Sequence, residues 1–144
     1  MDAIRQFVAP SSVPGLFLVA IAIAAILVYV PFFAVGLGRL QVGYDSHRPR
    51  AMFDKLPPYA QRATWAHQNG FESLAFFTPA ALMAYATEQS STVALGAAIA
   101  YLVARLLYPL FYIFDIPILR SMMFAVANLG VFTLFYLSCR TALV

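Results

Sequence analysis

The sequence predicts an all-α integral membrane protein, a four-transmembrane-helix bundle that occupies the whole chain as a single domain (residues 1–144). Two observations lead to this fold class. The chain is 62% hydrophobic and only 10% charged, whereas a soluble domain carries about 25% charged residues. Its apolar residues also gather into stretches separated by short polar breaks, and a spanning helix needs about 20 mostly apolar residues.

The same composition excludes several other classes of protein. A chain this apolar is neither disordered nor a low-complexity fibre. The single cysteine, Cys139, excludes an intrachain disulfide framework, and with only two histidines, His47 and His67, the sequence predicts no metal site. The formal net charge of +3 is small, and we interpret it as a sign of membrane topology and not of nucleic-acid binding.

The first two spans differ in how clearly they stand out. Residues 15–37 carry no charge and are long enough to cross a bilayer, with Pro31 placed to kink the helix. The second apolar stretch, residues 74–86, is too short to span alone. The second helix must therefore begin near Pro58 and run to about residue 87. It then carries polar residues into the membrane, namely Gln61, Arg62, Gln68, Asn69 and Glu72.

The third and fourth spans complete the bundle. Residues 92–114 form the third span and contain Arg105, and residues 117–139 form the fourth, with Arg120 in its first turn. The polar breaks at 88–91 and 115–117 separate the spans. Between the first and second spans, residues 38–58 are rich in glycine and proline, and we expect a loop with at most a short helix there.

The distribution of basic residues predicts the topology. Four spans place both termini on the same side of the membrane, together with Arg5 and Arg140. The opposite side holds six basic residues, which are Arg39, Arg48, Arg50, Lys55, Arg62 and Arg120. Because cytoplasmic loops carry an excess of Lys and Arg, we expect the 38–58 loop to be cytoplasmic and to cover the mouth of a site, and both termini to be non-cytoplasmic.

Three of the four predicted helices carry polar residues near the cytoplasmic side. A charge at bilayer depth costs at least about 2.5–3.5 kcal/mol, so such residues face a cavity or a partner. Helical periodicity places the polar residues of each span on one face. The faces comprise Arg62, Trp65, Asn69 and Glu72; Arg105, Tyr108 and Tyr112; and Arg120, Ser121, Phe124 and Asn128. This pattern predicts a polar site at the cytoplasmic membrane surface, with Asn69 and Glu72 directed into the bundle.

The residues alone also allow a purely structural interpretation. Glu72 would then form a buried ion pair with Arg105 or Arg62 that fixes the helix register. Asn69 and Asn128 would form hydrogen bonds between helices. Spacing does not separate this interpretation from a ligand site.

Four short motifs resemble one membrane protein family. The stretch Arg62-Ala-Thr-Trp-Ala-His-Gln-Asn-Gly-Phe-Glu72 resembles the signature of the MAPEG family, the membrane-associated proteins of eicosanoid and glutathione metabolism, which reads roughly R-x-x-R-A-x-x-N-x-x-E on the second of four helices. The other three stretches resemble the family's G-x-x-R on the first helix, its arginine followed by ring residues on the third, and the arginine that opens the fourth. They are Gly36-Leu-Gly-Arg39, Arg105-Leu-Leu-Tyr108-Pro-Leu-Phe-Tyr112 and Arg120-Ser121.

The resemblance implies a homotrimer that binds the co-substrate glutathione between neighbouring subunits and takes a lipophilic electrophile or hydroperoxide from the lipid. By position Arg120 would be the catalytic cation. It would ionise the glutathione thiol, because a free thiol has a pKa near or above about 8.5. Arginines suit the two carboxylates of glutathione through paired donors, and Glu72 suits its ammonium. The glutathione-binding residues implied are Arg39, Arg62, Asn69, Glu72, Arg105, Tyr108 and Tyr112.

The chain departs from the family pattern at three positions. Trp65 stands where many members have an arginine, and tryptophan cannot pair with a carboxylate, while Ser73 and Phe124 stand where some members have a tyrosine. Three functions therefore stay open. The leading one is a membrane glutathione transferase or peroxidase. The others are a non-catalytic MAPEG-fold trimeric scaffold or binding protein, and a small carrier or channel subunit whose polar stripes line a pathway.

Overall fold

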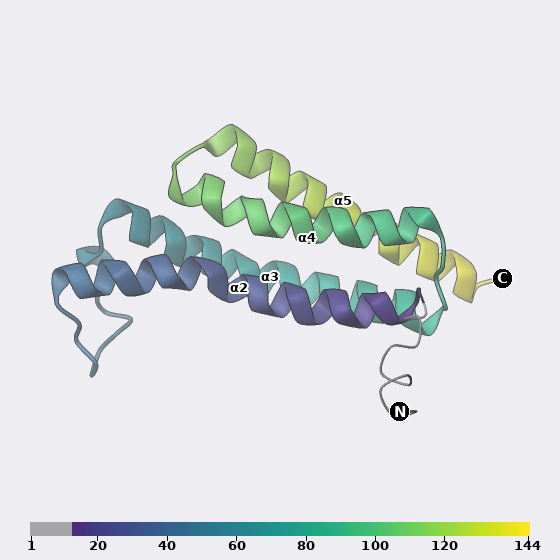
Figure 1. Ribbon diagram of the computed structural model, residues 1–144, viewed down its shortest axis with the longest axis horizontal. Coiled ribbons are helices and arrows are strands. Elements are labelled where there is room, and N and C mark those ends of the chain that lie inside the picture. Colours follow the sequence, from purple (N-terminus) through teal and green to yellow (C-terminus); the bar gives the residue numbers. More distant parts are fainter. Residues whose placement is uncertain (1–12) are drawn as a thin grey trace, which may run out of the picture.

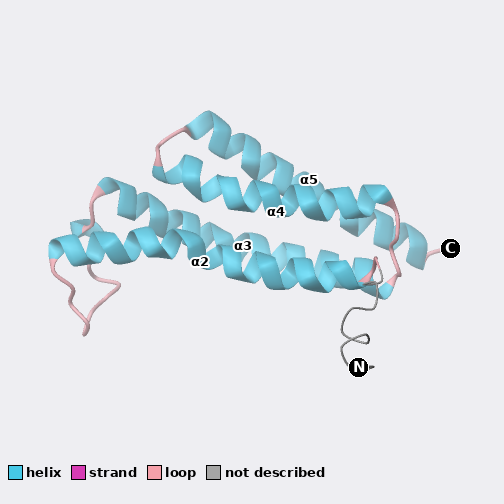
Figure 2. Cartoon of the chain, viewed as in Figure 1, coloured by secondary structure: helices cyan, strands magenta, loops and turns pink. Residues whose placement is uncertain are grey.

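The computed structural model of the protein describes residues 13–144, and this part of the chain folds into four long α-helices (Figure 1). Arg5, which entered the topology prediction, lies outside the described residues. A short 3₁₀ helix, η1, lies in the segment between the first two long helices, and the rest of the described chain is turn or loop (Figure 2). The elements are α2 (Gly15–Val42), η1 (Phe53–Lys55), α3 (Pro58–Ala86), α4 (Thr92–Ile113) and α5 (Pro117–Ala142).

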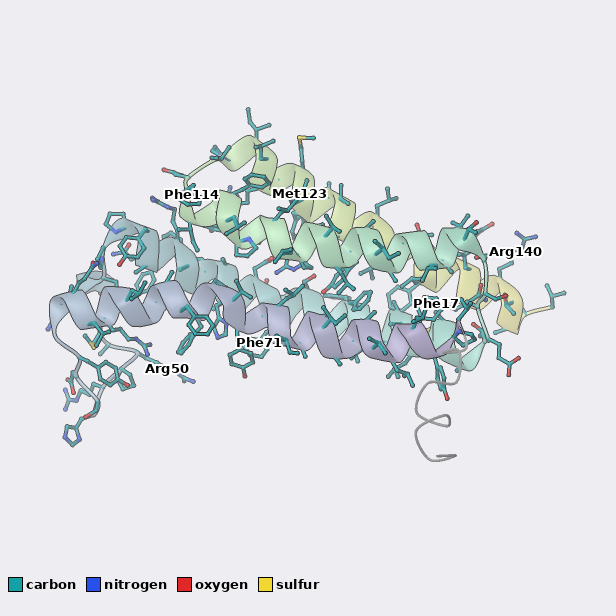
Figure 3. All side chains as sticks on the ribbon, viewed as in Figure 1. Phe17, Arg50, Phe71, Phe114, Met123 and Arg140 are labelled. Carbon is teal, nitrogen blue, oxygen red and sulfur yellow. The ribbon has the colours of Figure 1, made fainter. Side chains whose placement is uncertain are left out.

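The four helices form two antiparallel pairs that pack against each other. Helix α2 pairs with α3 and α4 pairs with α5, while α3 contacts both helices of the second pair and α2 contacts α4 (Figure 1). We call the end where α2 and α4 finish the loop end, and the opposite end the terminal end. Arg50 and Phe114 lie toward the loop end, whereas Phe17 and Arg140 lie toward the terminal end (Figure 3). The predicted four-helix bundle is confirmed.

Three of these helices, α2, α4 and α5, are each long and apolar enough to cross a membrane. Helix α3 falls short of that composition because of the polar residues in its first half, which agrees with the weak second span in the sequence. Large apolar side chains such as Ile26, Phe33 and Leu129 lie exposed on the outside of the bundle. Acyl chains solvate such a surface, and helices satisfy their own backbone hydrogen bonds there. The protein is an integral membrane protein.

Small residues allow the helices to approach closely. The main core, toward the terminal end, is dominated by buried alanines together with a few larger side chains. In it, the Phe77 ring of α3 stacks on the Tyr101 ring of α4 with the centroids 3.7 Å apart. A second, smaller core cluster at the loop end joins Val35, Leu56, Ala60 and Ala63. The polar residues of α3 lie along the helix mostly between these two clusters.

Helix α2 is longer than predicted, which corrects the boundaries of the first span and of the loop. It runs to Val42 and not to residue 37, so the connecting segment is 43–57 and not 38–58. The reason is that Gly38 serves packing and not a turn, since a Cβ at this position would clash with the Cβ of Ala60. The chain leaves the helix only at Gly43, which adopts a φ of 82°. Pro31 remains inside the continuous helix.

The other helices begin and end close to the polar breaks. Pro58 and Pro117 open α3 and α5, where a missing N–H costs nothing because the first amides of a helix have no partner within it. The Ser91 hydroxyl caps α4 by accepting a hydrogen bond from the Ala94 amide at 3.2 Å. Helix α5 continues to Ala142, past the expected end at residue 139.

Candidate functional site

Six of the residues singled out in the sequence gather on α3, α4 and α5 in the half of the bundle nearer the loop end. We call them the polar cluster. The residues that α3 and α4 contribute are spaced by three or four positions, so on each of these helices they lie on one face. The members are Asn69 and Glu72 of α3, Arg105, Tyr108 and Tyr112 of α4, and Arg120 of α5.

A chain of hydrogen bonds links three members of the polar cluster. Nη1 of Arg105 donates to Oδ1 of Asn69 at 3.0 Å, and Nδ2 of Asn69 donates to Oε2 of Glu72 at 3.2 Å. Arg105 is only 7% exposed, and its Cζ lies 4.6 Å from the centroid of the Tyr108 ring. Asn69 therefore holds a buried guanidinium and a carboxylate in one network.

The direct ion pair that the structural interpretation assigns to Glu72 is not formed among residues 13–144. The one ion pair within 4.0 Å in residues 13–144 joins Arg62 to Asp115. Glu72 also lies on the outer face of α3 and is exposed within the single chain, so its place inside the bundle of a trimer stays a prediction. Glu72 follows Asn69 by three residues, so it points in a somewhat different direction from α3 and does not make the contact with α4 that Asn69 makes. Its carboxylate is thus accessible to a ligand or to another chain.

Arg120 completes the polar cluster from the start of α5. Its Cζ lies 4.5 Å from the centroid of the Tyr112 ring, and that ring meets Tyr108 edge-on at 5.6 Å. No carboxylate lies within 4.0 Å of Arg120 in the part of the chain that the structure describes. Helix α5 also begins without a side-chain cap. The free amides, the positive end of the helix dipole and the guanidinium together favour an anion at this point.

Trp65 extends the cluster as an aromatic surface. Its ring centroid lies 6.4 Å from that of Tyr112 and 5.5 Å from that of Phe53 in η1, and the side chain is 43% exposed. No pattern in the sequence predicts that Phe53 lies near the site, because this contact depends on how the 43–57 segment folds back. Ser73, in contrast, turns away and shares a hydrogen bond of 3.1 Å with the hydroxyl of Tyr101.

Arg62 is directed to the turn between α4 and α5. Its Nε donates to the carbonyl oxygen of Ile113 at 3.1 Å, and its Nη1 lies 3.5 Å from Oδ2 of Asp115. Both partners belong to the protein, so Arg62 stands apart from the polar cluster. Asp115 was predicted only as part of a break between helices. No local signal in the sequence could pair it with a residue so far away in the chain.

Arg39 belongs to the last turn of α2 and lies beside a different face of α3 from the polar cluster. It lines an open cavity of about 660 Å³ between α2, α3 and the 43–57 segment, together with Phe32, Arg50, His67 and Phe71. Its Cζ lies 5.5 Å from the Phe32 ring centroid, and its buried Nε has no hydrogen-bond partner within residues 13–144. Within a single chain, Arg39 therefore does not join the polar cluster.

His67 secures the contact between α2 and α3 beside this cavity. Its Nδ1 lies 2.7 Å from the carbonyl oxygen of Val28, one helical turn before Pro31. The rings of Phe32 and Phe71 both lie 5.0 Å from its own. His67 lies on the side of α3 away from the polar face, and a histidine at such a position is expected to pack against its neighbours and not to bind a ligand. The contacts of His67 agree with this expectation.

Comparison with known proteins identifies the family. A family model described as the MAPEG family matches residues 16–140, which is nearly the whole chain. No curated protein and no solved structure shows a significant match. Family membership supports a membrane function related to glutathione or to eicosanoid metabolism. Since the match extends from the start of α2 almost to the end of α5, the chain belongs to the MAPEG family.

Proposed function

We propose that this protein is a membrane glutathione transferase or peroxidase that acts on lipophilic electrophiles or hydroperoxides. The observation that carries the proposal is Arg120, a cation without a carboxylate partner among the described residues, held over Tyr112 at the uncapped start of α5. A thiol placed there ionises more readily than in water, because both the guanidinium and the helix end stabilise the thiolate.

The rest of the polar cluster suits the other groups of glutathione. Arg105 offers guanidinium donors to a carboxylate, and Asn69 and the tyrosines offer further polar contacts. Glu72 is exposed and, among the residues that the structure describes, accepts only the Asn69 amide, so its carboxylate can also accept a hydrogen bond from the ammonium of glutathione. In this proposal Arg62 is not a ligand contact, because both of its interactions go to the α4–α5 turn.

The reaction follows from an activated thiolate. Toward an electrophile, the sulfur forms a bond to carbon while the leaving group departs with the bonding electrons. Toward a hydroperoxide, the sulfur attacks the distal oxygen, the O–O bond breaks and the alkoxide leaves as an alcohol after protonation. A second glutathione then reduces the sulfenic acid of the first, which gives glutathione disulfide and water.

We further propose a homotrimer, supported by an exposed stripe along α3. Seven exposed residues recur at alternating spacings of three and four, the repeat by which helices pack along a seam. They are Trp65, Gln68, Glu72, Ala75, Pro79, Leu82 and Ala86. Lipid would be a costly environment for Gln68 and Glu72, whereas neighbouring copies of the chain cover them. The same neighbours can bring Arg39 of one subunit to the polar cluster of another. Crosslinking in membranes should trap trimers, and a stable monomer in mild detergent would contradict this assembly.

Calorimetric titration of glutathione into the detergent-solubilised protein tests the activity, with ultraviolet absorbance reporting thiolate in the complex. The wild type should bind glutathione partly as thiolate at neutral pH. Arg120→Ala should abolish the thiolate signal and turnover while the affinity for glutathione changes less. Arg140→Ala, the same change at an exposed position at the terminal end, is the matched control and should leave the signal intact.

Trp65 supports one competing function, a non-catalytic trimeric binding or scaffold protein, because it removes a cation from the family motif. Saturation with glutathione without thiolate, or no binding at all, would favour that function. Arg120 would then serve to hold a headgroup phosphate, and its replacement would lower only the stability in detergent. The polar cluster lies toward one end of the bundle, which argues against a pathway through the membrane.

A further inference from the structure

Helix α4 ends in a turn that glycine normally makes. The Ile116 amide donates to the Phe111 carbonyl at 2.8 Å and the Asp115 amide to the Tyr112 carbonyl at 3.2 Å, the hydrogen-bond pattern of a Schellman motif. Its left-handed position is occupied by Asp115, with a φ of 60°. Residues with a Cβ are disfavoured in this conformation, and aspartate is one of the few that adopt it, so a contact from a neighbouring helix adds to the stability of the turn.

Arg62 supplies that support from α3. The Ile113 carbonyl belongs to the last turn of α4, where carbonyl groups have no partner within the helix, and Nε of Arg62 donates to it at 3.1 Å. The second contact, to Asp115, is weaker because this carboxylate is 68% exposed. The bond to the carbonyl is therefore the stronger of the two polar contacts that Arg62 makes with the turn.

The same turn sets the geometry of the polar cluster. Tyr112 lies immediately before the turn and its carbonyl accepts one of the two Schellman bonds, while the Arg120 amide donates to Ile116 at 3.1 Å immediately after it. The Arg120 guanidinium lies 4.5 Å from the Tyr112 ring centroid. A shift of the turn would move these two side chains relative to each other.

We propose that Arg62 is a positioning residue that acts through the α4–α5 turn to hold Arg120 over Tyr112. Its effect on catalysis rests on the function proposed above, but its effect on the turn does not. This role differs from the one that the family resemblance implies for Arg62, which is direct contact with glutathione. The two roles predict different behaviour of the same substitution.

The test measures two properties of the intact protein in detergent. Amide hydrogen exchange follows Ile116 and Arg120, and steady-state kinetics with glutathione and an aryl halide separate kcat from KM. Arg62→Gln should speed exchange at both amides by about tenfold or more, the effect expected from losing one hydrogen bond with a charged donor. It should lower kcat while the KM for glutathione changes less than about twofold. Arg140→Gln, with the same loss of charge at the terminal end, should change neither property.

A double-mutant cycle identifies the route of the effect. If Arg62 acts through the turn, Asp115→Asn removes only the weaker of its two contacts. It should therefore slow catalysis less than Arg62→Gln does, and it should add little in the Arg62→Gln protein. Should Arg62→Gln fail to fold, Arg62→Lys takes its place, since it keeps the charge but places a carbon where Nε lies. Its exchange at Ile116 should rise by at least about threefold, a smaller part of the same effect.

Unchanged exchange at the turn, or a raised KM with unchanged kcat, would overturn the inference and return Arg62 to direct ligand contact. A wild-type protein that neither binds nor turns over glutathione would instead overturn the proposed function. In that case faster exchange in Arg62→Gln would still assign the turn to Arg62, because exchange does not depend on activity.

Discussion

At the scale of single residues, Trp65 is the departure from the family motif that bears most directly on glutathione binding. Its ring lies between Phe53 and Tyr112, where the family motif places an arginine. Trp65→Arg should tighten glutathione binding by about 10–150-fold. The new guanidinium would donate paired hydrogen bonds to a carboxylate of glutathione, an interaction worth roughly 1.5–3 kcal/mol. Calorimetric titration measures the change, and Trp65→Phe, which keeps an aromatic ring, is the control.

Weaker binding in Trp65→Arg would contradict this expectation and would mean that the indole itself packs against the ligand. Trp65 is the single tryptophan of the chain, so its fluorescence in the wild type reports directly on this point. Quenching on addition of glutathione would place the ligand beside the ring. An unchanged spectrum with full binding would place it elsewhere.

The sequence predicted which polar residues share a helix face, but only part of what they contact. Asn69, Arg105 and Arg120 follow from helical periodicity and from the cost of a polar group in lipid. The partners of Arg62 do not, because the Ile113 carbonyl is a backbone group whose position depends on how α4 ends. The separation of Arg39 from the polar cluster likewise depends on tertiary packing, because Arg39 lines the cavity between α2, α3 and the 43–57 segment.

At the scale of helices, close packing rests on a few glycines, and Gly130 of α5 is the clearest case. A Cβ at Gly130 would lie 2.7 Å from the carbonyl oxygen of Ala97 in α4, whereas a Cβ at Gly96 of α4 would meet no atom within 4 Å. Gly130→Ala should therefore push the two helices apart and destabilise the protein by about 1–3 kcal/mol.

Thermal unfolding in detergent measures both substitutions. Gly96→Ala should be neutral or stabilising by up to about 1 kcal/mol, because alanine favours a helix and nothing obstructs it. Equal effects of the two changes would mean that the α4–α5 contact adjusts freely.

Helix boundaries were predictable where the signal was local. Pro58 and Pro117 open their helices as expected, since proline fits the first turn and no later one. The end of α2 was predicted too early, because the span was bounded by its charge-free apolar stretch and by the segment rich in glycine and proline that follows it. Only the approach of Ala60 from α3 shows that Gly38 is needed inside the helix.

At the scale of the whole molecule, α3 organises the site through three faces. One face carries Asn69 toward α4, and another carries His67 toward α2 and the cavity that contains Arg39. Between them runs the exposed stripe with Gln68 and Glu72. The polar side chains in this stripe are exposed, and lipid is an unfavourable environment for them. In the proposed trimer, the polar cluster on one side of the stripe and Arg39 on the other would meet parts of neighbouring chains, so the proposed trimer and the proposed ligand site depend on each other.

The basic residues also predict which end of the whole molecule faces the cytoplasm. The loop end holds Arg39, Arg48, Arg50, Lys55, Arg62 and Arg120, while Arg140 lies at the terminal end. Because positive charge is retained in the cytoplasm, Ser46→Cys should react with a membrane-impermeant maleimide only from the cytoplasmic side.

The substitution is mild, since Ser46 is exposed and the Asp45 side chain, which accepts hydrogen bonds from the amides of His47 and Arg48, stays in place. The exposed native Cys139, near the end of α5, should react only from the opposite side. It should therefore be removed by Cys139→Ala in the Ser46→Cys protein. Labelling of position 46 from the non-cytoplasmic side would invert the bundle and place the polar cluster away from the cytoplasm.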